Sequence, residues 1–351
     1  MGNPLGLLGF CHSLASKLQP WQIFRLSLAG CDKRRNRVVM TQHTATPSSS
    51  HDATPQVLCI GSVLWDIIGR SPAEMRRGSD MPGRITRLPG GVAMNIAMTL
   101  ARFGLKPDLL SAVGRDPEGE ELIKACSQLG CGTTHVYRSE DLPTDRYMAV
   151  EGGNGLIAAI ADAHSLEAAG DKILRPLMDG TLGSGHAPYE GAIALDGNLT
   201  LSLLAEIATE PAFARADLRV APASPGKAER LRPFLTSTRG TLYVNLEEAG
   251  LLCQTTFTDS ETAALALIAR GAARVLVTDG GASASEANSH GELDRVITQK
   301  PPRVTVARVT GAGDTFMAAH IAAEARGEDR HKALATALQA AATYVSGESP
   351  L

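Results

Sequence analysis

Short apolar runs alternate with helix-like stretches along most of this chain, and this alternation restricts the fold more than any other feature. Most of the runs end in small or polar residues: VLCIGS (57–62), LLSAVG (109–114), AIALDGN (192–198), LRVAPAS (218–224), TLYVNLEE (241–248) and RVLVTDGG (274–281). Stretches such as AMNIAMTLARFG and ETAALALIARG lie between most of them. Continuous apolar strands that alternate with helices predict an α/β fold, with a mostly parallel sheet covered by helices on both faces.

Composition and charge exclude several kinds of partner. The formal net charge of -3 gives no reason to expect binding to a nucleic acid. No apolar run approaches the roughly 20 residues that span a bilayer, so no membrane is expected as a partner. The six cysteines show neither CxxC nor zinc-ligand spacing, which predicts reduced thiols and a cytoplasmic location.

Residues 1–55 differ in character from the rest of the chain. The segment CDKRRNRVVM is basic, and TQHTATPSSSHDATP is a polar tract typical of disorder. Three interpretations are open: a non-native extension that precedes a true start at Met40, a disordered tail, or a targeting segment. The folded domain is expected over 56–351.

One segment interrupts the alternation of strands and helices. In RYMAVEGGNGLIAAIAD (146–162), two apolar runs are joined through GGNG, and Asn154-Gly155 is expected to supply the positive φ angles of a tight hairpin. Further extended segments are expected between 64 and 88. Together with 145–162 they could form a small separate β-sheet, and such sheets often serve as lids over a larger α/β domain.

The segment VARVTGAGDTF (306–316) combines flexible glycines with a carboxylate. A strand-like run, RVTVARV (303–309), precedes the glycines and a helical pattern follows them. Backbone N–H groups at a helix start attract anions, and glycine lets the backbone approach a phosphate closely. Asp314 could then be a general base beside the phosphate. Alternatively, it could be an ordinary capping aspartate.

Two motifs, TGAGDTF (310–316) and GGVAMNIAMTLARFG (90–104), resemble the signatures of the ribokinase-like (PfkB) carbohydrate and nucleoside kinases. GSVLWD, NLEE (245–248) and VTDGG (277–281) match further family segments in the right order. The resemblance covers about 57–349. It implies a ribokinase-like three-layer α/β sandwich with a mostly parallel central sheet and a small β-sheet lid, and transfer of phosphate from ATP to a sugar hydroxyl.

The resemblance also implies roles for single residues. Asp314 would be the catalytic base, with an anion hole formed by the N–H groups of Gly311, Ala312 and Gly313. The substrate's hydroxyls would contact Asp66, Gly90, Gly91 and Asn95. Glu248 would help to hold Mg²⁺, although it could instead be a solvated glutamate of a first helical turn. ATP would be bordered by Asn245, Thr278, Gly280, Gly281 and Thr310.

Three residues depart from the family pattern. Arg308 replaces an acidic or amide residue near a monovalent-cation site in many relatives, so dependence on K⁺ is open; its guanidinium could replace the cation or point to solvent. Ser283 stands where the nucleotide loop usually has its last glycine, and Asp279 where an apolar residue is common. Arg308 and Ser283 keep open the alternative of a non-catalytic relative that senses nucleosides.

Several segments resemble the pseudouridine kinase branch of the family: GLIAAIAD (155–162), ALDGNL (194–199) and APASPGKAERL (221–231). This resemblance implies phosphorylation of the 5′-hydroxyl of pseudouridine. Ribose, adenosine or a keto sugar acid are the alternative substrates within the family. Lid-mediated homodimers occur among relatives, so a homodimer is a further expectation.

Overall fold

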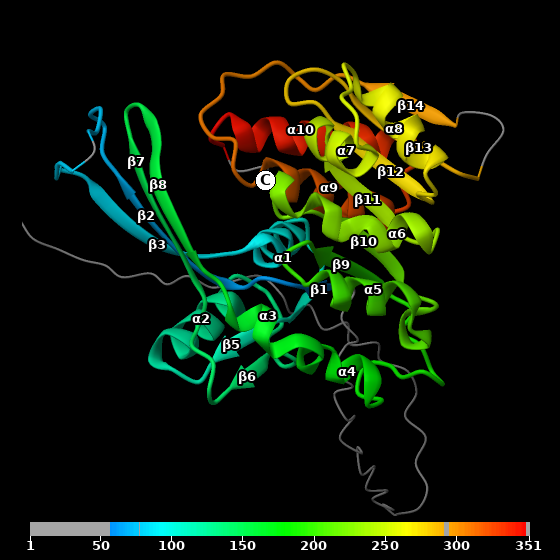
Figure 1. Ribbon diagram of the computed structural model, residues 1–351, viewed down its shortest axis with the longest axis horizontal. Coiled ribbons are helices and arrows are strands. Elements are labelled where there is room, and N and C mark those ends of the chain that lie inside the picture. Colours follow the sequence, from blue (N-terminus) through cyan, green and yellow to red (C-terminus); the bar gives the residue numbers. More distant parts are fainter. Residues whose placement is uncertain (1–56, 77, 291–294, 349–351) are drawn as a thin grey trace, which may run out of the picture. The chain divides into compact units, whose positions relative to one another are not determined.

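The computed structural model of the chain describes residues 57–76, 78–290 and 295–348. The extension over 1–55 predicted from the sequence lies outside these residues. Within them, an eight-stranded sheet has the order β14-β13-β12-β11-β10-β9-β1-β4 (Figure 1). Six neighbouring strands are parallel: β1 (Val57–Ile60), β4 (Pro107–Leu110), β9 (Ala192–Asp196), β10 (Asp217–Ala221), β11 (Thr241–Asn245) and β12 (Arg274–Thr278). At one edge the sheet continues with two antiparallel strands, β13 (Ala284–Asn288) and β14 (Val296–Gln299).

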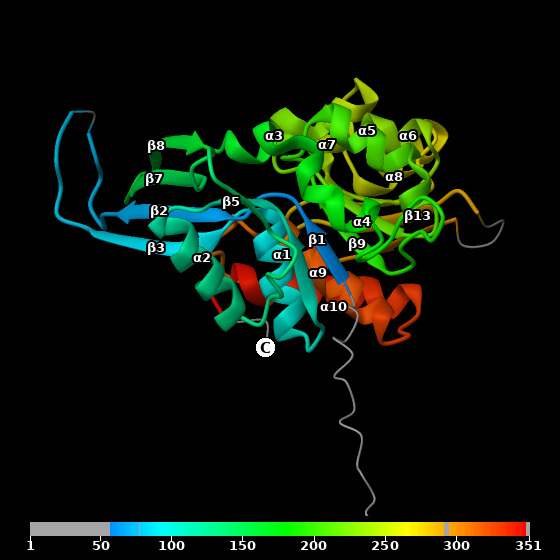
Figure 2. The same cartoon turned by 90° about the horizontal axis from the view of Figure 1, so that it is seen from below.

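Helices cover both faces of this sheet, as predicted for a three-layer α/β sandwich. Alternate residues of β1 point to opposite cores: Leu58 and Ile60 join one, and Val57 and Cys59 join the other. Figure 2 shows the two groups of helices on opposite sides of β1 and β9. The first group contains α3 (Ser165–Ala169), α4 (Arg175–Met178), α5 (Leu201–Thr209), α6 (Arg232–Thr236), α7 (Leu246–Cys253) and α8 (Ser260–Ala269). The second contains α1 (Val92–Arg102), α2 (Pro117–Gln128), α9 (Ala312–Ala325) and α10 (Arg330–Val345).

Local sequence signals explain where these helices begin and end. The N-cap of α2 is Asp116, which accepts a hydrogen bond from the Gly119 amide, and Pro117 occupies the first helical position. Gly104 and Gly271, which follow α1 and α8, adopt positive φ angles that end a helix without steric cost. Three short 3₁₀ helices connect other elements: η1 (Gly170–Leu174), η2 (Pro211–Phe213) and η3 (Pro225–Leu231). No helix in the described ranges is both long and apolar enough to cross a membrane.

A second sheet of four strands has the order β3-β2-β7-β8 and extends away from the large sheet (Figures 1 and 2). Its strands are β2 (Leu64–Arg70), β3 (Arg84–Gly90), β7 (Arg146–Gly152) and β8 (Gly155–Asp162). Of the two expected turn residues between β7 and β8, Gly155 has a positive φ but Asn154 does not. The Asn154 side chain instead accepts a hydrogen bond from the Met75 amide at 3.1 Å, which ties the hairpin to the segment between β2 and β3.

Two sequence predictions about strands are wrong. The run LLSAVG is not one strand: β4 ends at Leu110, and β5 (Ala112–Gly114) pairs with β6 (Tyr137–Ser139) in a separate two-stranded sheet. The run 303–309 forms no strand, although Val304 and Val306 have the two-residue spacing of a strand. No neighbouring strand pairs with it, and Val306 and Val309 are 63% and 68% exposed, so no burial favours an extended strand.

Candidate active site

The glycine turn before α9 is closely packed at its first glycine and open at its second. Gly311 is the N-cap of α9 with φ 89°, and a Cβ added to it would lie 2.6 Å from the Tyr344 hydroxyl oxygen. Glycine is therefore required at this position by both backbone conformation and space. A Cβ at Gly313 would meet no atom within 4 Å, so the turn is open on that side.

The backbone amides of this turn differ in availability. The Ala312 amide donates to the Val309 carbonyl at 3.0 Å, so it is already occupied and the prediction that it belongs to an anion hole does not fit this geometry. The amides of Gly313 and Asp314 have no hydrogen-bond partner within the described part of the chain. A bound anion would therefore find two free donors at the start of α9, where the helix dipole also favours negative charge.

The Asp314 carboxylate does not cap its own helix. No side-chain capping bond is present at α9, and Asp314 Oδ2 instead accepts a hydrogen bond of 2.9 Å from Asn95 Nδ2 of α1. Burial raises the pKa of Asp314 from 3.8 to about 7, although the bond from Asn95 opposes this shift. The alternative of a simple capping aspartate is thus excluded by geometry, and Asp314 is available as an acid or a base near neutral pH.

Three further carboxylates lie within electrostatic reach of Asp314. The charges of Asp196, Glu248 and Asp66 all raise its pKa. These acids come from β9, α7 and β2, so the fold brings together residues that are far apart in the sequence. Such a concentration of negative charge is a place where cations or hydroxyl groups bind favourably.

Asp66 and the two glycines of the substrate prediction are adjacent. Asp66 lies within β2 of the four-stranded sheet. A side chain on Gly90 would collide with the Asp66 carboxylate, which makes glycine necessary there. Burial raises the pKa of Asp66 to about 6. No ion pair joins this carboxylate to a cationic side chain in the described part of the chain, so it is able to accept hydrogen bonds from hydroxyl groups.

Sequence reasoning missed the residues that fix this glycine pair. Asp196 Oδ2, at the end of β9, accepts hydrogen bonds from the Ser62 amide at 2.8 Å and the Ser62 hydroxyl at 2.5 Å. The Ser62 oxygen also accepts a bond of 2.9 Å from the Val92 amide at the start of α1, beside Gly91. The only signal in the sequence was that Asp196 ends an apolar run.

Two other residues that sequence reasoning did not single out meet beside Ser62. Asn198 Nδ2 donates to the Ser62 hydroxyl at 3.0 Å, and Lys227 Nζ donates to Asn198 Oδ1. Asn198 lies in the segment ALDGNL and Lys227 in the segment APASPGKAERL. This hydrogen bond therefore joins two of the segments that resemble the same branch of the family. Both side chains are half-buried, and this is the one hydrogen bond that the Lys227 side chain makes in the described ranges.

The expected nucleotide residues gather around the ends of β11 and β12. Asn245 is the N-cap of α7, and it forms a capping box with Glu248, with both hydrogen bonds at 2.8 Å. Thr278 pairs directly with Asn245 between the two strands. Added Cβ atoms at Gly280 and Gly281 would meet nothing within 4 Å, so this loop is open to a ligand. The Thr310 carbonyl, directly before the glycine turn, accepts a hydrogen bond of 2.8 Å from the Tyr344 hydroxyl.

The acids near Asp314 fit a divalent cation held only partly by protein. Glu248 is 6% exposed, and burial raises its pKa to about 7, which indicates an anion that lacks a compensating charge. One of its oxygens is used in the capping box, which leaves the other for a metal or a metal-bound water. Within the described ranges, no three histidine, cysteine or acidic side chains lie close enough to form a complete metal site.

A family model described as pfkB family carbohydrate kinase matches residues 54–350. The chain belongs to this family. The pseudouridine kinase of Escherichia coli is 29% identical over 273 residues, which are 75% of this chain and 81% of that protein. An uncharacterized sugar kinase of the same bacterium is 29% identical over 274 residues, 76% of this chain and 72% of that protein. A carbohydrate kinase from Agrobacterium tumefaciens has a similar structure, with a TM-score of 0.70, 26% identity, and coverage of 84% of this chain and 93% of that one.

For a pfkB-family kinase, the arrangement supplies the elements of phosphoryl transfer. The free amides of Gly313 and Asp314 could donate hydrogen bonds to an anionic phosphoryl group, and the Asp314 carboxylate lies on the same helix turn. ATP would supply the phosphoryl group, and its magnesium ion would neutralise charge on the phosphates. The nucleotide would be held by the loop after β12, and the metal would be placed through Glu248.

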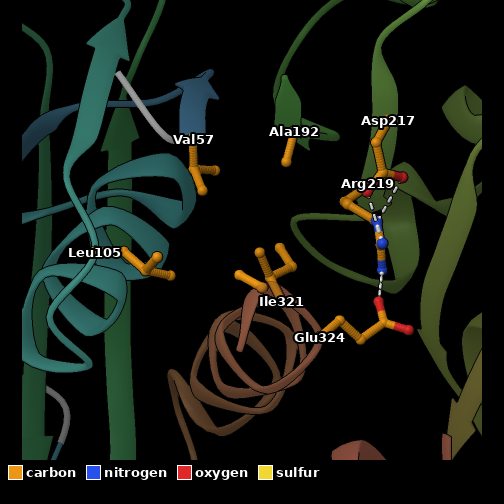
Figure 3. Close-up of a pocket in the computed structure, with 8 residues that line it drawn as sticks. Val57, Leu105, Ala192, Asp217, Arg219, Ile321 and Glu324 are labelled. Atoms are coloured by element: carbon orange, nitrogen blue, oxygen red, sulfur yellow. Dashed lines mark hydrogen bonds and ion pairs between the residues drawn. The ribbon is translucent and has the colours of Figure 1, made fainter. Parts of the chain in front are cut away.

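A cavity of about 540 Å³ lies at the other end of α9 (Figure 3). It is lined by the first residues of three strands, Val57, Ala192 and Asp217, and by Glu324 near the end of α9. Arg219 points toward Glu324 and pairs with it at 2.5 Å, and also pairs with Asp217 at 2.6 Å. The charges of this cavity are thus compensated within the protein, unlike those around Asp314.

Proposed function

We propose that this chain is an ATP- and Mg²⁺-dependent kinase that phosphorylates the 5′-hydroxyl of pseudouridine. The observation that carries the kinase part is the position of Asp314, whose carboxylate lies beside two free amides and accepts a bond from Asn95. The pseudouridine part is supported by similarity to the pseudouridine kinase of E. coli. A reducing, cytoplasmic setting agrees with the free, buried cysteines 59, 126, 131 and 253.

Each proposed step uses a group of this chain. Asp66 and the free Oδ1 of Asn95 accept hydrogen bonds from the hydroxyls of the ribose-like ring. Asp314 takes the proton of the 5′-hydroxyl while the hydroxyl oxygen forms a bond to the terminal phosphorus of ATP. The bond from that phosphorus to the leaving oxygen of ADP breaks. The amides of Gly313 and Asp314 stabilise the negative charge on the phosphoryl oxygens during transfer.

The Asn198–Lys227 pair supports a substrate with a heterocycle. Lys227 has three N–H donors and uses one of them on Asn198. The remaining donors suit the carbonyl oxygens of a uracil-type ring. Neither the ribose ring nor adenine carries such carbonyl oxygens. A site that is built to bind such groups discriminates strongly against substrates without them, because its polar atoms would be left unpaired.

A coupled ADP-release assay over pseudouridine, uridine, adenosine, ribose and 2-keto-3-deoxygluconate tests this proposal. We expect the highest kcat/KM with pseudouridine. Lys227→Met should raise KM for pseudouridine by about tenfold or more and should change KM for ribose little. Lys300→Met is a suitable control, because Lys300 is exposed and has no partner in the described ranges. A preference for another compound would reject the pseudouridine assignment and retain the kinase.

A sugar kinase is the second candidate, because the uncharacterized sugar kinase of E. coli is equally similar. Preference for ribose or a keto sugar acid in the same assay would favour it. A nucleoside sensor is the third candidate; it would bind pseudouridine in calorimetry without releasing ADP.

We further propose that the enzyme is a homodimer that joins through the four-stranded sheet. By strand register, Met148 and Ile160 face the same side, and Asp66 faces the other. On the side of Met148 lie large apolar side chains that are 43–76% exposed: Ile85, Met148, Leu156 and Ile160. Several exposed apolar side chains on one side of a sheet favour association with a second copy.

A further inference from the structure

The segment 300–310, which leads into the glycine turn, has no secondary structure and is almost entirely exposed. Within the described ranges, the Val309 carbonyl accepts a bond from the Ala312 amide at the start of α9, and the other hydrogen bonds of this segment to the rest of the protein go to the end of α10 and the residues after it. The amides of Ala307 and Arg308 donate to the Val345 carbonyl at 2.9 and 3.2 Å. The position of a long exposed segment therefore depends on one small region.

The Arg308 side chain makes most of this attachment. Its guanidinium carbon lies 3.8 Å from the centre of the Tyr344 ring, which is a cation–π contact. Its Nε donates to the Tyr344 carbonyl at 2.8 Å, and one terminal nitrogen donates to the Glu348 carbonyl at 3.0 Å. Carbonyls at a helix C-terminus lack partners within the helix and carry partial negative charge, so a planar cation with several donors suits them.

Tyr344 extends the attachment into the glycine turn itself. Its hydroxyl donates to the Thr310 carbonyl at 2.8 Å, and the same oxygen occupies the space that a side chain on Gly311 would need. Arg308 therefore fixes the tyrosine ring, and the ring fixes the residues directly before the free amides. Asp314 follows only three residues after Gly311, on the first turn of α9.

We propose that Arg308 and Tyr344 are positioning residues for phosphoryl transfer: their stacked pair holds the segment 307–311 against the end of α10, and thereby orients the amides of Gly313 and Asp314. They act through the backbone and touch no reactant. The inference rests on the kinase activity proposed above. It also explains the unusual residue at position 308, whose side chain neither points freely to solvent nor enters the acidic cluster around Asp314.

The test compares Arg308→Ala, Arg308→Lys and Tyr344→Phe with Arg303→Ala. Arg303 lies in the same segment, is exposed and has no partner in the described ranges, so it controls for the loss of one positive charge. Three quantities are measured: hydrogen exchange of the amides of Ala307, Arg308 and Ala312, affinity for a non-hydrolysable ATP analogue, and kcat with KM for the nucleoside. The first two need no phosphate acceptor, so they remain informative if the proposed substrate is wrong.

We expect Arg308→Ala to speed hydrogen exchange at these three amides. It should also lower the affinity for the ATP analogue by about tenfold and lower kcat by a similar factor. KM for the nucleoside should stay within about twofold, since no hydrogen bond in the described ranges joins Arg308 or Tyr344 to Asp66 or Gly90. Arg308→Lys and Tyr344→Phe should give intermediate losses, and millimolar guanidinium should partly restore Arg308→Ala. Arg303→Ala should behave as the unchanged chain.

Equal behaviour of Arg308→Ala and Arg303→Ala in exchange and analogue affinity would overturn the proposal. A lower melting temperature of Arg308→Ala with unchanged exchange in this segment would overturn it too, because it would show a purely structural role. If Arg308→Ala does not fold, the Tyr344→Phe variant tests the proposal, since it removes one hydroxyl and keeps the ring. Unchanged exchange and affinity in that variant would then reject the role of the pair.

Discussion

Asn95 donates a hydrogen bond of 2.9 Å to Asp314, and these residues are 219 positions apart in the sequence. Asn95 lies on the first turn of α1 and Asp314 on the first turn of α9, so the bond joins the starts of two packed helices. An amide N–H favours the charged form of a carboxylate. The bond therefore fixes the side chain of Asp314 and opposes the effect of burial on its pKa.

Replacing Asp314 by Asn should lower kcat by at least ~10²-fold, because the asparagine amide cannot accept the proton of the attacking hydroxyl. Affinity for ATP should change little, since the backbone amides remain. Steady-state kinetics and calorimetry measure the two effects. Asp80→Asn makes the same chemical change at an exposed position without a partner in the described ranges, and should leave kcat unaltered. Normal turnover by Asp314→Asn would exclude Asp314 as the base.

The same variant should be more stable than the unchanged chain at pH 8. The folded-state pKa of Asp314, about 7, lies above its ordinary value of 3.8, so the folded chain holds more protons between these two pH values. The carboxylate therefore destabilises the fold increasingly as pH rises toward 7. Asparagine removes this effect, and a melting temperature a few degrees higher is expected at pH 8. The difference should shrink toward pH 5.

The pH dependence of kcat/KM should report the acids around Asp314. A base must be deprotonated to act, so activity should rise with pH and level off above an apparent pKa near 7. Asp66 and Glu248 interact with Asp314, so the midpoint belongs to the group of acids together. Asn95→Leu removes a donor that lowers the pKa of Asp314 and should move the midpoint to higher pH. Mere loss of a substrate contact would lower activity without moving this midpoint.

Much of the fold could be predicted from the sequence because its signals are local. Apolar runs predicted five of the parallel strands directly, and glycines marked the ends of α1 and α8. The prediction failed where a local pattern had no partner in space. The spacing of Val304 and Val306 in 303–309 favours a strand, but a strand needs a neighbour, and this segment bonds instead to the end of α10.

The site was predicted less completely, for a related physical reason. Asp314, Asn95 and Asp66 stand in recognisable motifs, whereas the roles of Ser62, Asn198 and Tyr344 depend on contacts across long sequence separations. Ser62 matters because Asp196, 134 positions away, accepts its hydrogen bonds. Likewise, the occupation of the Ala312 amide by the Val309 carbonyl depends on the exact path of the turn, which residue types alone do not determine.

Glu248→Gln should raise the Mg²⁺ concentration needed for half-maximal activity by about tenfold, since one negative charge near the metal is lost. A glutamine oxygen can still accept the bond from the Asn245 amide, so the capping box and the melting temperature should persist. Titration of Mg²⁺ in a kinase assay measures the change. Glu247→Gln is the matched control, because Glu247 is its exposed neighbour. An equal Mg²⁺ requirement in both variants would remove Glu248 from the metal site.

Ile160→Lys should dissociate the proposed dimer. The side chain is 61% exposed on the apolar face that is expected to be covered by a second copy, and a charge there would be buried without a partner. Sedimentation velocity at micromolar concentration should show a monomer for this variant and a dimer for the unchanged chain. Leu251→Lys introduces the same charge at a 40% exposed position on α7 and should leave the dimer intact. A monomeric unchanged chain would exclude this role for the sheet.

Deleting residues 1–39 should leave kcat, KM and the melting temperature unchanged. The family model begins to match at residue 54, and the basic and polar segments before it have the composition of a sequence that contributes no core. Parallel kinetic and calorimetric measurements on the full and shortened chains test this, with a start at Met40 as the shortened form. A fall of several degrees in melting temperature would show that residues 1–39 pack against the kinase domain. A loss of activity at constant melting temperature would instead show that residues 1–39 contribute to substrate binding or to assembly.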